Sequence, residues 1–186
     1  LNLKFNENVL SETNNFELHL TDANQLSGLP ESLVESAAQQ AKSKNKEGWI
    51  FTLHFPSYGP FMKYSKNRQL REELYRAYTS RCNHNDASDN KNTIKKIVNL
   101  RLKEAQLLGY NNFAQYVLEE RMAESPEKVD NFLEVLHNAS RPFALKEIEA
   151  VKNFARKNGL EDELMPWDFS YYSEKLKNTT FGFDEE

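Results

Sequence analysis

Apolar residues recur at helical spacing through most of the chain. Leu70, Leu74, Ala77 and Tyr78 line one face of NRQLREELYRAYTSR, because residues three and four apart share one side of an α-helix. The same period predicts about six helices in total. They are expected over residues 28–42, 67–81, 93–109, 111–123, 125–139 and 144–159.

Helix ends are marked by residues with special backbone or capping chemistry. Gly109 follows the 93–109 pattern where a left-handed C-terminal cap is expected. Ser125, Pro126 and Glu127 are typical of a helix start. Pro142 is expected to kink the next helix or restart it.

Two short segments instead alternate between apolar and polar residues. FELHL, residues 16–20, and WIFTLHF, residues 49–55, have an apolar residue at every second position, which is typical of strands with one buried face. The breaker PSYGP, residues 56–60, is expected to end the second strand. LNLKF, residues 1–5, fits either period. The pattern therefore predicts a protein that is mainly α with a small β-sheet.

Length and composition narrow the class of protein. The 186 residues favour a single unit spanning residues 1–186. With 24 basic and 28 acidic residues, the net charge of −4 disfavours a nucleic-acid partner. No apolar run approaches the roughly 20 residues of a membrane span. Cys82 is the single cysteine, which favours a reducing, cytoplasmic location.

The segment RCNHNDASDNKN, residues 81–92, has the residue types of a metal site but the wrong spacing. One residue separates Cys82 from His84, whereas structural zinc pairs have two to four. Counted from Asp86, a calcium loop would need Gly at position 91 and Glu at position 97, where Lys91 and Ile97 stand. We therefore interpret the segment as a polar connector between two helices, with Asn92 or Thr93 as the cap of the second.

Other candidates for chemistry are weaker. His19 and His54 lie on the polar faces of the two predicted strands, with Glu17 near His19, but zinc usually needs three or more protein ligands. The sequence contains neither H-E-x-x-H nor G-x-S-x-G nor a phosphate-binding glycine loop. The aromatic residues Trp167, Tyr171 and Tyr172 have the rings to stack a ligand, although core packing is their commoner role. From the residues alone, the chain is not a complete enzyme.

The order of several segments is more specific than any single motif. LKFNENVL, FELHLTD, LSGLPESLVESAAQQAK and WIFTLHFPSY are followed by YSKNRQLREELYRAY, LRLKEAQLLGYNNFAQYVLEERMAESPEKVDNFL and MPWDFSYYSEKLKNTTFGFDEE. This order resembles the interior of the thimet-oligopeptidase-like zinc metallopeptidases. The resemblance implies a helical portion of an ellipsoidal, neurolysin-like shell around a channel that admits short peptides. It also implies that Trp167, Tyr171 and Tyr172 lie on or near the channel wall.

The same resemblance sets expectations about zinc and partners. The family holds one zinc ion through the histidines of H-E-x-x-H and a glutamate of a later helix, and no residue here matches them. We therefore expect this chain to be an interior portion that binds no zinc and is inactive alone. Its expected partner is the missing catalytic domain of the same polypeptide, with short peptides as substrates.

Only the polar connector, residues 81–92, bears on the cleavage specificity of the parent peptidase. Its N-D-x-x-D-N string, residues 85–90, favours the peptidyl-dipeptidase branch, which releases C-terminal dipeptides. The alternative is an endopeptidase of the oligopeptidase A type. A stand-alone helical interaction module is the alternative of another class, and ends that fall within elements disfavour it.

Overall fold

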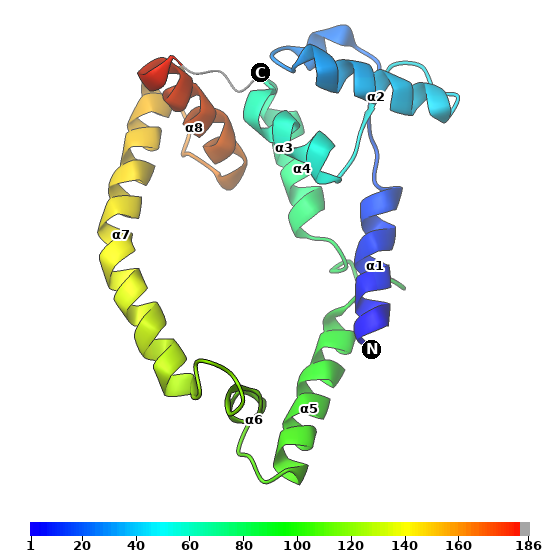
Figure 1. Cartoon of the computed structure of the whole chain (residues 1–186). Coiled ribbons are helices and arrows are strands. Elements are labelled where there is room, and N and C mark those ends of the chain that lie inside the picture. Colours follow the sequence, from blue (N-terminus) through cyan, green and yellow to red (C-terminus); the bar gives the residue numbers. More distant parts are fainter. Residues whose placement is uncertain (183–186) are drawn as a thin grey trace.

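A computed structural model gives the fold and describes residues 1–182. The last four residues of the MPWDF…FGFDEE string lie outside this range. The elements of the described part are mostly helices (Figure 1). In chain order they are α1 (Asn2–Asn15), β1 (Leu18–Leu20), the 3-10 helix η1 (Ala23–Leu26), α2 (Glu31–Ser43), β2 (Trp49–Phe51), α3 (Phe55–Tyr64), α4 (Arg68–Thr79), α5 (Lys91–Leu107), α6 (Phe113–Leu118), α7 (Pro126–Lys157) and α8 (Pro166–Phe181). The mainly α class with a small sheet is thus confirmed.

The sheet is one antiparallel pair, with α2 as the connection between its strands. Leu18 of β1 lies opposite Phe51 of β2, so both apolar side chains enter the core. Gly48 precedes β2 with a φ of +85°, and a Cβ there would lie 2.2 Å from the carbonyl oxygen of Leu20. Only glycine fits this close approach of the two strands.

The second strand is shorter than the alternation predicts. β2 ends at Phe51, and α3 already begins at Phe55, whose side chain is exposed. PSYGP lies inside α3 instead of ending a strand. Pro56 stands in the first turn, where its missing N–H costs nothing. Pro60 removes only one bond from the single turn that follows, so a short helix tolerates both prolines.

Within residues 1–182, two clusters of buried side chains form the core. The larger lies between the sheet, α2, α3 and α4 and includes Trp167 of α8. Its buried members are Leu18, Leu20, Leu33, Ala37, Phe51, Leu53, Phe61, Met62, Leu70, Leu74 and Trp167. The smaller joins the end of α7 to α8 and contains Val151, Ala155, Leu160, Tyr171 and Tyr172. α8 therefore belongs to both clusters.

The ribbon traces a ring in Figure 1. α7 runs along one side, α4 and α5 run along the other, α6 joins them at one end and α8 at the other. α7 is one helix with Pro142 inside it, so the helix curves but does not restart there. α6 covers only six residues of the predicted 111–123 helix. No helix within residues 1–182 has the length and apolarity that crossing a membrane requires.

Candidate functional site

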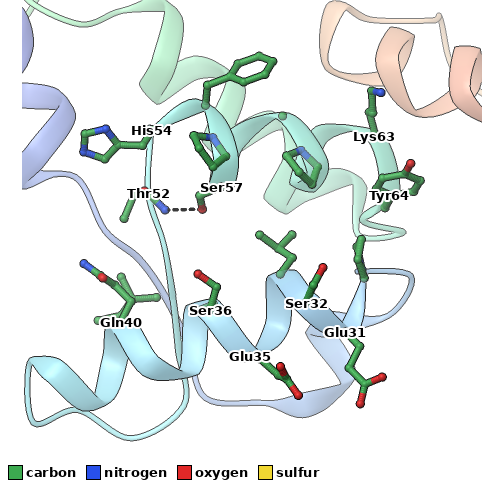
Figure 2. A pocket seen from close by; sticks show the side chains of 18 residues that line it. Glu31, Ser32, Glu35, Ser36, Gln40, Thr52, His54, Ser57, Lys63 and Tyr64 are labelled. Carbon is green, nitrogen blue, oxygen red and sulfur yellow. Dashed lines mark hydrogen bonds between the residues drawn. The ribbon is translucent and has the colours of Figure 1, made fainter. Parts of the chain in front are cut away.

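A groove of about 1100 Å³ opens between α2 and α3. Figure 2 shows Glu31, Glu35 and Ser36 on the α2 side, with His54 and Lys63 on the α3 side. The hydroxyl group of Ser36 points toward α3 (Figure 2). The carboxylates of Glu31 and Glu35 and the ammonium group of Lys63 point away from the space between the two helices.

Local sequence explains how these walls are placed. Pro30 precedes α2 with an extended backbone, and Glu31 in the first turn complements the positive end of the helix dipole. On the other wall, the backbone N–H of Thr52 donates to Oγ of Ser57 at 3.0 Å (Figure 2). This bond holds the turn between β2 and α3, so the groove has a defined shape.

The groove has the chemistry of a binding surface. His54 is an exposed residue at the start of α3. Within residues 1–182, its imidazole makes no hydrogen bond to a hydroxyl or carboxylate group that it could activate. Nucleophilic catalysis requires such a pair. Lys63 is also 3.4 Å from Glu174 of α8, so the ammonium group links the groove wall to the end of the chain. The groove is thus a concave surface lined by both polar and apolar side chains.

The three aromatic residues predicted near a channel are buried. Trp167 is 6% exposed and lies in the larger core cluster, while Tyr171 and Tyr172 lie in the smaller one. The guanidinium groups of Arg76 and Arg71 stack over the rings of Trp167 and Tyr171 at 4.8 and 4.2 Å. Burial raises the pKa of Tyr172. Their place on a channel wall stays a prediction about a longer protein.

Asp168 forms a buried ionic cluster that the sequence did not single out. Its side chain is fully buried and accepts hydrogen bonds from Nη2 of Arg71 at 2.8 Å and Nη2 of Arg68 at 2.9 Å. Arg68 also donates through Nε to both carboxylate oxygens at 3.1 Å. We call Arg68, Arg71 and Asp168 the clasp, because they tie α4 to α8 across 97 and 100 positions of the chain.

Backbone groups complete the hydrogen bonding of the clasp. Arg71 donates to the carbonyl oxygens of Ser65 at 2.7 Å and Trp167 at 3.1 Å. The backbone N–H of Met165 donates to Asp168 at 3.2 Å, which closes a capping box at the start of α8. The hydrogen bonds that Arg68 donates to Asp168 raise the pKa of Arg68. The buried groups of Arg71 and Asp168 are thus hydrogen-bonded on several sides, and these bonds connect α4 to α8. The P-W-D string was the available signal, but its arginine partners were not deducible from it.

The structure does not assemble the two-histidine metal site considered from the sequence. Nε2 of His19 is 2.7 Å from the carbonyl oxygen of Glu47. Glu17 instead pairs with Lys44 and Lys46, each at 2.5 Å, and these lysines lower its pKa to about 2. Within residues 1–182, no group of three or more His, Cys, Asp or Glu side chains is placed to hold a metal ion.

The segment of residues 81–92 is mainly a structural joint. It connects α4 to α5, as predicted, but Asn90 rather than Asn92 or Thr93 precedes the helix. Asn90 accepts a hydrogen bond from Asn8 at 2.9 Å and donates to the carbonyl oxygen of Phe5 at 3.0 Å. The backbone N–H of Cys82 donates to Glu12 at 2.6 Å. These bonds hold α1 against the joint, which no local pattern reveals.

Comparison with known proteins identifies relatives along the whole chain. The family described as "Peptidase family M3" matches residues 61–186. The chain is 40% identical to the oligopeptidase A of Haemophilus influenzae and 43% identical to the probable cytosolic oligopeptidase A of Arabidopsis thaliana. It is 29% identical to the dipeptidyl carboxypeptidase of Escherichia coli.

These relatives are much longer than the chain. Each alignment covers 100% of this chain but only 28%, 28% and 27% of the respective relative. The chain thus spans little more than a quarter of the length of the curated proteins it matches.

Proposed function

Because the chain belongs to peptidase family M3, we propose that it is a non-catalytic portion of a zinc metallopeptidase that hydrolyses short peptides. The match over residues 61–186 carries this proposal. The resemblance seen in the segment order supports it independently. The part played by residues 1–186 is to build one section of the shell around the substrate channel.

Zinc chemistry belongs elsewhere in the proposed parent protein. The sequence has no H-E-x-x-H, and residues 1–182 offer no ligand cluster that fits a metal ion. A catalytic zinc site needs three protein ligands and an open position for water. We therefore assign no reaction step to this chain and expect it to be inactive alone.

The higher identity with oligopeptidases A favours an oligopeptidase A type of specificity. Two such relatives are 40% and 43% identical to the chain, against 29% for a dipeptidyl carboxypeptidase. Peptidyl-dipeptidase activity, favoured by the N-D-x-x-D-N string, is the second candidate. That string forms part of a structural joint with α1, so packing constrains it whatever the specificity. A cytoplasmic location stays a prediction, since one relative is described as cytosolic and another as organellar.

Activity of the longer reading frame tests the proposal. The product extended beyond Glu186 should hydrolyse short peptides, lose activity with a chelator and regain it with zinc. The 186-residue chain with added zinc should give no turnover. Zinc-dependent turnover by the chain itself, or no turnover by the extended protein, would overturn the proposal.

A peptide pair separates the two specificities. One substrate carries a free C-terminal carboxylate, and the other has the same sequence with a C-terminal amide. Endopeptidase cleavage should yield the same internal fragments from both, whereas peptidyl-dipeptidase activity should release dipeptides from the free acid and fall at least tenfold on the amide. Mass spectrometry of the products identifies the bond that is cut.

A further inference from the structure

One side of α7 is apolar and bare over most of its length. We define the α7 face as Phe132, Leu133, Leu136 and Phe143, and each of these side chains is exposed. Their spacing places them on one side of the helix. Every residue from 130 to 150 is exposed, although a surface helix normally buries its apolar side.

The α7 face continues a surface that is already covered further along the helix. Val151 and Phe154 follow Phe143 by eight and eleven residues, which keeps them on the same side. Val151 is buried, and Phe154 packs against the cluster formed with α8. α8 thus covers the last turns of this apolar side, while its earlier turns have no covering element within residues 1–182 (Figure 1).

The total surface of the chain is too large for a compact monomer. The chain exposes 12852 Å². A compact monomer of 21.7 kDa would expose about 9,200 Å². The excess of roughly 3,600 Å² exceeds the share of about 1,000–2,500 Å² that one partner contributes to an obligate interface of about 2,000–5,000 Å² in total. Such an area points to a permanent neighbour rather than a passing contact.

We propose that the α7 face is the docking surface for the part of the parent polypeptide that this chain lacks. The inference rests on the proposed function insofar as that function makes the chain a portion of a longer peptidase. The relatives have about 72% of their length outside the matched region, which is ample to supply a covering element. The α7 face directly adjoins the part of α7 that α8 covers. This continuity is expected if a further segment of the same polypeptide covers the α7 face beside α8.

Hydroxyl-radical footprinting of the extended protein tests this docking surface. The oxidation rates of Phe132 and Phe143 are measured by mass spectrometry in the 186-residue chain and in the extended protein. Both rates should fall at least tenfold in the extended protein, independently of its concentration. Leu145 is the matched control, because it is 53% exposed and lies two residues from Phe143, on the opposite side of α7. Its rate should change less than twofold.

Three results would overturn the inference. Unchanged rates at Phe132 and Phe143 would show that the α7 face stays bare. Protection that disappears on dilution, together with a dimer in sedimentation, would make a second copy the occupant. Equal protection of Leu145 would show that the covering is not specific to this face. The same preparation is assayed for zinc-dependent hydrolysis, so protection without hydrolysis rejects the proposed function and keeps the docking surface.

Discussion

Two regions of the molecule are built from amphipathic helices but have different surroundings. They are the closed end, where α3 and α4 meet the sheet and α8, and the open arm, formed by α5 and the first two-thirds of α7. At the closed end, α3 and α4 pack on the sheet and on α8, and Leu74 is fully buried. In the arm, α5 and the first two-thirds of α7 carry exposed leucines, valines and phenylalanines. An apolar stripe therefore predicts that a helix has a partner but not that the partner lies in the same chain.

The closed end also contains the polar group that fixes its geometry. Arg71 and Asp168 of the clasp are buried and join α4 to α8, whereas α7 has no buried ion pair among residues 130–150, which are all exposed. Removal of a buried ionic partner leaves an uncompensated charge, while removal of an exposed one does not. The two regions should consequently respond very differently to the same kind of substitution.

The largest effect is expected from Asp168→Ala. The change leaves Arg71 buried without its carboxylate and should lower the free energy of unfolding by about 3–5 kcal/mol. Asp162→Ala is the control. Asp162 is an exposed partner of Arg68, which also pairs with Asp168, and its removal should lower the free energy of unfolding by less than about 1 kcal/mol. Urea unfolding followed by circular dichroism measures both, and similar losses for the two variants would contradict the role of the clasp.

A matched pair of leucine substitutions compares the two regions directly. Leu74→Ala in α4 empties a buried site and should cost about 2–5 kcal/mol. Leu133→Ala on the α7 face should change stability by no more than about 0.5 kcal/mol in the 186-residue chain. Chemical unfolding of both variants is the measurement. A large loss for Leu133→Ala in this chain would mean that the arm is already covered.

A smaller and local effect is expected at the joint between α4 and α5. Asn90→Ala removes the hydrogen bonds to Asn8 and Phe5 and should cost about 1–3 kcal/mol, since each of the two bonds is worth about 0.5–1.5 kcal/mol. Amide exchange should accelerate in α1 and stay unchanged in α4. Asn92→Ala, at an exposed position, is the control and should alter neither. Equal acceleration in both helices would show a global loss of stability instead.

The features that the sequence predicts correctly are those set by neighbouring residues. Ser125 accepts a hydrogen bond from the N–H of Lys128 at the start of α7, and Gly109 ends α5 with a φ of +89°. Both roles depend on residues within one helical turn. The prediction of a strand up to Phe55 was wrong, because the same residues are also compatible with a helix that begins at Phe55 and has Pro56 in its first turn.

The clasp and the joint of residues 81–92 were harder to predict because their contacts join distant segments. Asp168 and Arg68 are 100 positions apart, and Asn90 binds a carbonyl 85 positions away. Nothing in the periodicity pairs these residues. The burial of Trp167 in the larger core follows from the same long-range contact, since the clasp sets α8 against α4.

The smallest effect is expected from Tyr58→Phe, which should alter the pH dependence of the Tm only at alkaline pH. Its ring stacks on Tyr78 with centroids 4.2 Å apart, and burial raises its pKa from 10.0 to about 12. Because the folded protein favours the protonated phenol, this stabilisation is complete below pH 10 and is lost between about pH 10 and 12. Tyr58→Phe removes the titrating phenol, so this contribution to the loss of Tm with rising pH should be absent from the variant. The Tm of the wild type should fall more steeply than that of the variant between pH 10 and 12.

The fall in Tm with pH will not vanish in the variant, because the raised pKa of Tyr172 acts in the same direction. Thermal unfolding from pH 8 to 12 measures both slopes, and equal slopes would place the alkaline sensitivity outside the stacked pair at the closed end.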